Sequence, residues 1–185
     1  MAHTRRLDSR VPKWILSAAA ALVVGSGCER KAEPPTVAPG EWRTFEGSWN
    51  AAGTRRSIPL GADRKASTID LRGTMLLAGA GRPGVGFNAE VVAMVDSQTG
   101  LVGRGVWTDE RGDQVFSELT GEGTREHNHI TGTIIGGTGR YTGAAGSYEF
   151  AWQFVLESED GALQGRAEGL KGRYRVGQGA EGSKP

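Results

Sequence analysis

The chain has 185 residues, a net charge of +1 and 30 glycines. Without the basic leader described below, 18 Lys and Arg face 20 Asp and Glu, and this net charge of −2 excludes an electrostatic nucleic-acid binder. The single cysteine, Cys28, excludes an intrachain disulfide and a cysteine-ligated metal in the folded part. The remaining length suits one domain, and glycines between short Val-, Ile-, Thr- and aromatic-rich runs favour antiparallel strands over helices.

Residues 1–27 are predicted to be a signal peptide. Four basic residues precede an apolar run, Trp14–Val24, that is shorter than the about 20 residues needed to span a bilayer. The small residues before Cys28 resemble a bacterial lipobox, in which the cysteine is lipidated and becomes the mature N-terminus, although Gly25 stands where such boxes prefer Leu. The alternative is ordinary cleavage after Gly27, which would release a soluble secreted or periplasmic protein.

Residues 28–41 are predicted to form a lipidated N-terminus and a flexible linker, because the segment is polar and rich in Ala and Pro. By resemblance to bacterial sorting rules, Glu29 after the cysteine would let the protein reach the outer membrane, where it would face the periplasm. The expected partner is therefore a membrane, reached through the lipid anchor. Residues 177–185 have almost no apolar content and are predicted to be a disordered tail.

The region 42–176 is predicted to hold about eight strands. Trp42–Trp49 alternates weakly, and Arg55–Leu60 fits an edge strand because it contains Pro59. Ser67–Leu77 alternates clearly, with Ile69, Leu71, Met75 and Leu77 on one face. The other predicted strands are Phe87–Val95, Leu101–Thr108, Gln114–Thr120, Ile130–Ile135, Tyr148–Leu156 and Leu163–Val176. Their short turns leave no crossover for parallel pairing, so we expect an all-β, antiparallel, closed or nearly closed barrel, which removes the sheet edges.

The segment Thr133–Leu156 joins a glycine-rich corner to the clearest alternation in the chain. Five glycines are predicted to form the corner: Gly136, Gly137, Gly139, Gly143 and Gly146. The apolar residues that follow at period two are Tyr148, Phe150, Trp152, Phe154 and Leu156, which predicts one aromatic face directed into the barrel. An eight-stranded barrel is wide enough either to be filled by such side chains or to hold one small ligand.

The corner sequence GGTGRYTGAAG, residues 136–146, resembles the GGTGxYxGAxG signature of the allene oxide cyclase and dirigent proteins. The resemblance implies a calycin-like barrel of eight strands in which this segment forms a corner. Plant members cyclise an unstable fatty-acid epoxide or steer radical coupling in an apolar cavity. No position of this sequence matches their site residues, so the resemblance implies a fold and no catalytic residue.

Three charged residues interrupt the predicted strands, namely Glu90, Arg104 and Glu118. The favoured interpretation is a solvated outer face, and the alternative places them in the lumen around a ligand, together with Trp152 and Phe154. His127 and His129 lie on one side of a strand but lack a third ligand, so a polar turn is favoured and no metal or cofactor is predicted.

The sequence therefore indicates a cell-envelope lipoprotein whose barrel binds a small apolar ligand or serves as a structural or interaction domain. The alternative is a cyclase or isomerase that acts on a lipid-like substrate. An open apolar pocket holding Glu90 or Glu118 would favour the enzyme, and a lumen packed solid would exclude both interpretations that need a cavity. An exposed apolar patch on the outer wall would favour a protein partner.

Overall fold

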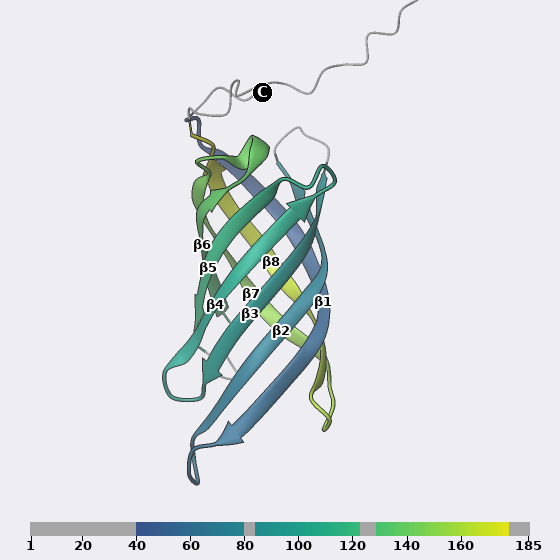
Figure 1. The fold of residues 1–185 in the computed structure, drawn as a ribbon, viewed down its shortest axis with the longest axis vertical. Coiled ribbons are helices and arrows are strands. Elements are labelled where there is room, and N and C mark those ends of the chain that lie inside the picture. The colour runs from purple at the N-terminus through teal and green to yellow at the C-terminus, as the bar shows by residue number, and fades with distance from the viewer. Residues whose placement is uncertain (1–39, 80–83, 123–128, 178–185) are drawn as a thin grey trace, which may run out of the picture. The chain divides into compact units, whose positions relative to one another are not determined.

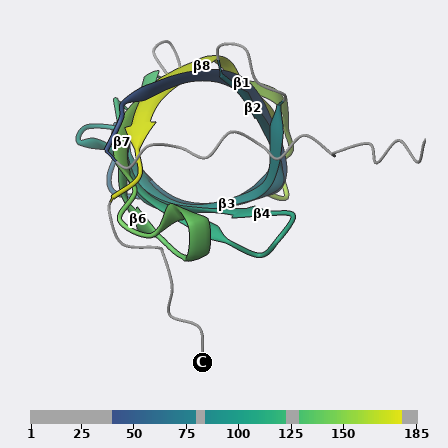
Figure 2. The same ribbon diagram turned by 90° about the horizontal axis from the view of Figure 1, so that it is seen from above.

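The computed structural model describes residues 40–79, 84–122 and 129–177, which form a single closed antiparallel barrel (Figures 1 and 2). Its elements are β1 (Arg43–Pro59), β2 (Lys65–Ala78), β3 (Val85–Asp96), β4 (Gly100–Asp109), β5 (Gln114–Gly121), β6 (His129–Gly137), the short 3-10 helix η1 (Gly139–Tyr141), β7 (Ala145–Glu157) and β8 (Ala162–Arg175). Each strand pairs with the next, and β8 pairs with β1. The predicted all-β barrel is confirmed. Among the described residues, no helix is long and apolar enough to cross a membrane.

β1 is one continuous strand, so the prediction of two strands separated near residue 50 is wrong. Asn50 pairs with Thr74 of β2 on one side and with Arg166 of β8 on the other. Gly53 permits a close approach between β1 and β2. A Cβ on Gly53 would lie 1.8 Å from the carbonyl oxygen of Asp70 on β2.

The predicted alternation places apolar side chains in the lumen. Ile69, Leu71 and Met75 of β2 are buried. On β7 the buried row comprises Tyr148, Phe150 and Trp152, while Phe154 is half-buried. Leu156 departs from the row, because the pairing of β7 with β8 shifts register between Phe154 and Leu156 and leaves Leu156 46% exposed.

The middle of the lumen is filled by a set of buried residues that we call the central layer: Met75, Ala89, Ser117, Tyr148 and Leu170. The ring centroid of Tyr148 lies 4.9 Å from that of Trp107 toward one end and 6.2 Å from that of Phe150 toward the other. The hydroxyl of Tyr148 donates to Ser117 Oγ at 2.9 Å. The barrel is therefore closed at mid-height by packed side chains.

The glycine-rich segment forms the corner between β6 and β7, and η1 lies within it (Figure 1). Gly139 and Gly143 adopt φ angles of 50° and 70°, which disfavour any residue with a Cβ. Gly137 is required for a different reason, since a Cβ there would lie 2.4 Å from the carbonyl oxygen of Gln114. The corner thus joins two adjacent strands at the end of the barrel where β1 begins.

Candidate functional site

The lumen holds two cavities, one on each side of the central layer. The upper cavity, of about 360 Å³, lies at the end with η1, which is at the top of Figure 1. The lower cavity, of about 400 Å³, lies at the opposite end, near the turn between β1 and β2. No described residue lines both cavities. The two volumes fall within the range of small-molecule sites, about 300–1,000 Å³.

The lower cavity has apolar and aromatic walls. Most lining residues face inward at alternate positions of their strands: Trp49, Ile69, Leu71, Val91, Ala93, Val95, Leu101, Leu119, Ile130, Phe150, Trp152 and Phe154. The ring centroids of Trp49 and Trp152 are 5.1 Å apart, and Phe150 meets Trp49 edge to face at 6.1 Å. Such walls favour an apolar ligand, because burying apolar surface is worth about 25 cal/mol per Å².

The polar lining of the lower cavity comes from Arg55, Lys65, Ser67 and Ser97. The Arg55 side chain is only 16% exposed, pairs with Glu157 and lies 4.9 Å above the ring of Phe154. Its Nε has no hydrogen-bond partner among the described residues. The described lining contains no carboxylate, so its polar groups are mainly hydrogen-bond donors.

Two indole groups of the lower cavity are also unpaired. The Nε1 atoms of Trp49 and Trp152 are buried and find no acceptor in the described part of the chain. Most buried donors in folded proteins have a partner, so two unpaired indoles beside one cavity are unusual.

The upper cavity is walled largely by rings. The centroids of Phe45 and Phe87 lie 6.4 and 6.1 Å from that of Trp107, and Phe87 lies 5.9 Å from Tyr141. Tyr174 of β8 also lines the cavity.

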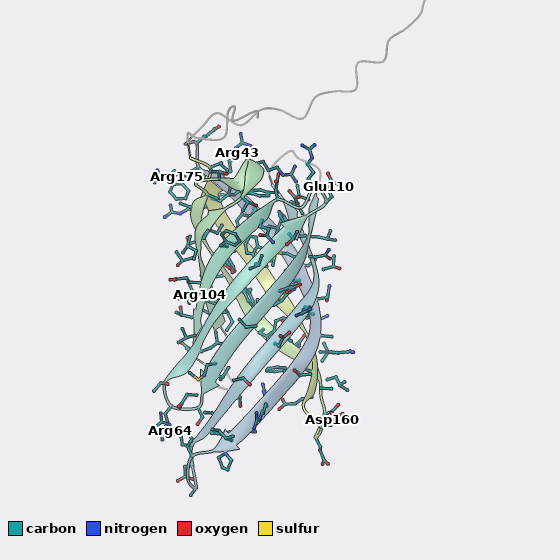
Figure 3. The ribbon with its side chains drawn as sticks, viewed as in Figure 1. Arg43, Arg64, Arg104, Glu110, Asp160 and Arg175 are labelled. Atoms are coloured by element: carbon teal, nitrogen blue, oxygen red, sulfur yellow. The ribbon has the colours of Figure 1, made fainter. Side chains whose placement is uncertain are left out.

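Arg43 is an inward-facing cation at the mouth of the upper cavity. It lies two residues before the buried Phe45 on β1 and opposite Tyr174 on β8. Its side chain is 13% exposed, and its Nη1 is buried without a hydrogen-bond partner. The nearest carboxylate, that of Glu41, is 3.8 Å from Nη2 and is 64% exposed. Figure 3 labels Arg43 at this end of the barrel.

A polar network fixes the corner beside the upper cavity. The hydroxyl of Tyr141 accepts a hydrogen bond from Arg140 Nε at 3.1 Å, and Arg140 Nη2 lies 2.5 Å from Asp109 Oδ2. Burial raises the pKa of Tyr141 and keeps the phenol protonated. Burial also opposes ionisation of Asp109, but the N–H groups of Arg111 and Asp113 and the guanidinium of Arg140 hold the pKa of Asp109 below its ordinary value.

The charged residues tentatively assigned to the lumen lie on the outer wall. The side chains of Glu90, Arg104 and Glu118 are 57%, 56% and 47% exposed. Arg104, which is labelled in Figure 3, pairs with Glu118 at 3.0 Å across β4 and β5. Arg72 lies 3.8 Å from Glu90 across β2 and β3. Each occupies the strand position opposite to its buried neighbours, as Glu90 does between Ala89 and Val91. The three side chains therefore lie on the outer wall and do not enter the lumen, where the alternative interpretation placed them.

Trp152 and Phe154 both line the lower cavity, as the tentative assignment to the lumen expected. Their role in binding stays a prediction. His129 is exposed, with Nε2 3.7 Å from a Glu149 carboxylate oxygen. His127 and Cys28 lie outside the described residues. Within the described ranges, no group of three or more His, Cys, Asp or Glu side chains is placed to hold a metal ion.

Sequence reasoning missed the two arginines that face inward, Arg43 and Arg55. The sequence does contain a signal for them, because both lie an even number of residues from the buried Phe45 and Trp49 and therefore on the same face of β1. For Arg55 it was hidden by the supposed break near residue 50.

A small apolar patch lies on the outer wall over β3 and β4. Val92, Met94 and Val102 are 57%, 61% and 58% exposed, and Met94 pairs directly with Val102. This is the kind of feature that an interaction domain requires.

The sequence matches no protein-family profile. It also matches no curated protein sequence. Among solved structures, that of the pterocarpan synthase dirigent protein is similar, with a TM-score of 0.46 and 14% sequence identity over 77% of this chain and 99% of that chain.

Proposed function

We propose that the barrel binds a small, largely apolar molecule in the lower cavity. The observation that carries the proposal is a cavity of about 400 Å³ whose walls are apolar and whose polar groups are few. Side chains around an unfilled apolar space lose dispersion contacts, which a ligand of matching shape restores. Since Arg55 and Lys65 supply donors and the described lining supplies no carboxylate, the ligand carries an acceptor oxygen near this charged part of the lining.

The proposal places this barrel in the bacterial cell envelope, anchored through a lipid on Cys28 at the outer membrane and facing the periplasm. It is supported by the basic head, the short apolar run and the small residues before Cys28. Metabolic labelling with a palmitate analogue should mark the wild-type protein and not Cys28→Ser. Label that persists on the variant would refute the anchor, and an unlabelled wild type would favour the soluble alternative.

The described geometry does not favour the cyclase or isomerase alternative. That interpretation requires Glu90 or Glu118 to point into an open apolar pocket, where either carboxylate would do acid–base work. Both side chains project from the outer wall instead. The outer patch of Val92, Met94 and Val102 leaves the interaction domain as the second candidate.

Native mass spectrometry of the full chain, purified from cells without a delipidation step, tests ligand binding. The expected result is a non-covalent adduct of roughly a few hundred daltons, the mass that a cavity of this size admits, which disappears under denaturing conditions. Ala93→Leu should remove the adduct, because residue 93 faces the lower cavity. Ala151→Leu on the exposed face of β7 is the matched control and should retain it. An adduct that both variants keep, or a bare wild-type mass, would contradict the proposal.

A further inference from the structure

We propose that the upper cavity is a second ligand site, separate from the lower one, that takes an aromatic anion. The ligand class is a flat apolar ring system with one carboxylate or sulfonate. Arg43 would hold the charged group, and the rings around the cavity would hold the apolar body. The inference stands on the upper cavity alone and does not depend on the function proposed for the lower cavity.

The charge and N–H groups of Arg43 are poorly compensated by the described residues. A guanidinium that is removed from water needs a counter-ion and partners for its N–H groups. Arg55, which faces inward on the same strand, has Glu157 and the ring of Phe154. Arg43 has only Glu41 at 3.8 Å, and its Nη1 has no partner among the described residues. A ligand carboxylate or sulfonate would supply both the charge and the acceptor.

Other charged side chains at this end of the barrel have partners. Asp109 forms an ion pair with Arg140. Arg173 and Arg175 each lie 5.0 Å from the ring of Trp42, with both arginines on the exposed face of β8. Glu41 is thus the one carboxylate in the described lining of the upper cavity, and it is the group that a ligand anion would displace.

The aromatic walls of the upper cavity suit a flat ring system. Phe45 meets Trp107 at an interplanar angle of 82° and Phe87 meets it at 64°, so the cavity presents both ring faces and ring edges. Aromatic pairs favour edge-to-face and offset contacts over face-to-face sandwiches. A flat aromatic body inserted here makes such contacts with several rings at once, whereas a flexible chain would lose more conformational freedom on binding.

The central layer separates the upper cavity from the lower cavity. Tyr148, Met75 and Leu170 of the central layer line neither cavity and lie between the two. A ligand in the upper cavity therefore contacts Trp107 and leaves Trp49 and Trp152 untouched.

The test compares two probes of the same shape, 2-naphthoate and its neutral analogue 2-naphthamide, by calorimetric titration of the full chain. We expect naphthoate to bind about tenfold or more tightly than naphthamide, the gain typical of a charge-assisted hydrogen bond. Arg43→Gln should remove this preference and leave naphthamide binding unchanged. Arg43→Lys should keep part of it. Glu41→Gln should strengthen naphthoate binding because the competing carboxylate is gone.

Arg175→Gln is the matched control, since it removes one positive charge at the same end but from the outer wall. It should leave the preference within about twofold. The location is checked by the indole N–H resonances in a proton–nitrogen correlation spectrum, assigned through Trp→Phe variants. Naphthoate bound in the upper cavity should shift the signal of Trp107, whereas the signals of Trp49 and Trp152 report binding in the lower cavity.

Four results would overturn the inference: no naphthoate binding, equal affinity for both probes, a preference that survives Arg43→Gln in a variant with unchanged melting temperature, or a Trp107 signal that naphthoate leaves unshifted. None of them bears on the adduct in the lower cavity, which Ala93→Leu tests separately. Conversely, a bare native mass would remove the function proposed for the lower cavity and leave this inference intact.

Discussion

Tyr148 combines an aromatic core position with a buried hydrogen bond. It is 3% exposed, and its hydroxyl donates to Ser117 Oγ, which in turn donates to the carbonyl of Gly105 at 3.4 Å. Burial raises the pKa of Tyr148 to about 12, because the phenolate would lose its hydration. The side chain therefore remains neutral in the folded protein at pH values where an unfolded chain begins to ionise.

Tyr148→Phe should lower the free energy of unfolding at pH 7 by about 1 kcal/mol, the net value of one buried hydrogen bond. The variant should also change the response to alkaline pH. In the wild type, the stabilisation from the raised pKa is complete below pH 10, the ordinary value for tyrosine, and is lost as the pH rises through about 12. Urea denaturation between pH 8 and pH 11 measures this. Wild-type stability should fall more steeply than that of Tyr148→Phe, and parallel curves would contradict the assignment.

The charge of a strand residue does not determine whether its side chain faces the lumen or the solvent. Glu90 and Arg104 are charged residues of a kind that could line a polar site, yet they pair with neighbours on the outer wall. Arg43 and Arg55 look no different in the sequence, yet the parity of β1 turns them inward. Parity decides the face because side chains alternate strictly along a strand, so a residue's neighbours at i±2 are more informative than its own charge.

Strand boundaries were harder to predict than strand identity. The alternation of apolar and polar residues in β2 and β7 predicts both strands directly. The glycine corner between β6 and β7 resembles the GGTGxYxGAxG signature. The predicted strands Trp42–Trp49 and Arg55–Leu60 leave residues 50–54 outside both, although these residues belong to β1. In the barrel, Gly53 serves contact between strands, since a Cβ on it would lie 1.8 Å from the carbonyl oxygen of Asp70 on β2. Whether a glycine makes a turn or a close contact depends on the partner strand, which local sequence does not show.

The pairing of β6 with β7 includes a close contact of this kind between a glycine and a side chain of the partner strand. Gly132 of β6 lies directly opposite Tyr148 of β7, and a Cβ on Gly132 would lie 2.0 Å from Tyr148 Cζ. The tyrosine ring therefore packs onto the glycine backbone.

Gly132→Ala should destabilise the barrel by about 1–3 kcal/mol, because the ring must leave its position in the packed central layer. Gly86→Ala on β3 is the control, since its Cβ would meet only an ordinary contact of 3.7 Å from Leu76. Thermal unfolding followed by circular dichroism measures both variants. Equal melting temperatures for the two variants would show that the ring moves aside at no cost.

The barrel as a whole contains two cavities, one at each end, and the central layer separates them. Each cavity has one inward-facing arginine from β1 near its mouth, Arg43 in the upper cavity and Arg55 in the lower cavity. The sequence predicted the closed barrel and its aromatic interior, but not that the interior is filled at mid-height and open toward both ends. That division depends on how the side chains of several strands meet across the lumen, which no single strand pattern encodes.

Because the packed central layer separates the two cavities, we expect binding in one cavity to be independent of binding in the other. Packed interiors are close to crystal density, and substitutions at sites without shared contacts usually add within about 0.3–0.5 kcal/mol. Ala93→Leu, whose larger side chain projects into the lower cavity, should therefore change the affinity of the upper cavity for 2-naphthoate by no more than about twofold. Calorimetric titration of wild type and variant measures this. A larger change would mean that Tyr148 and its neighbours in the central layer transmit occupancy from one cavity to the other.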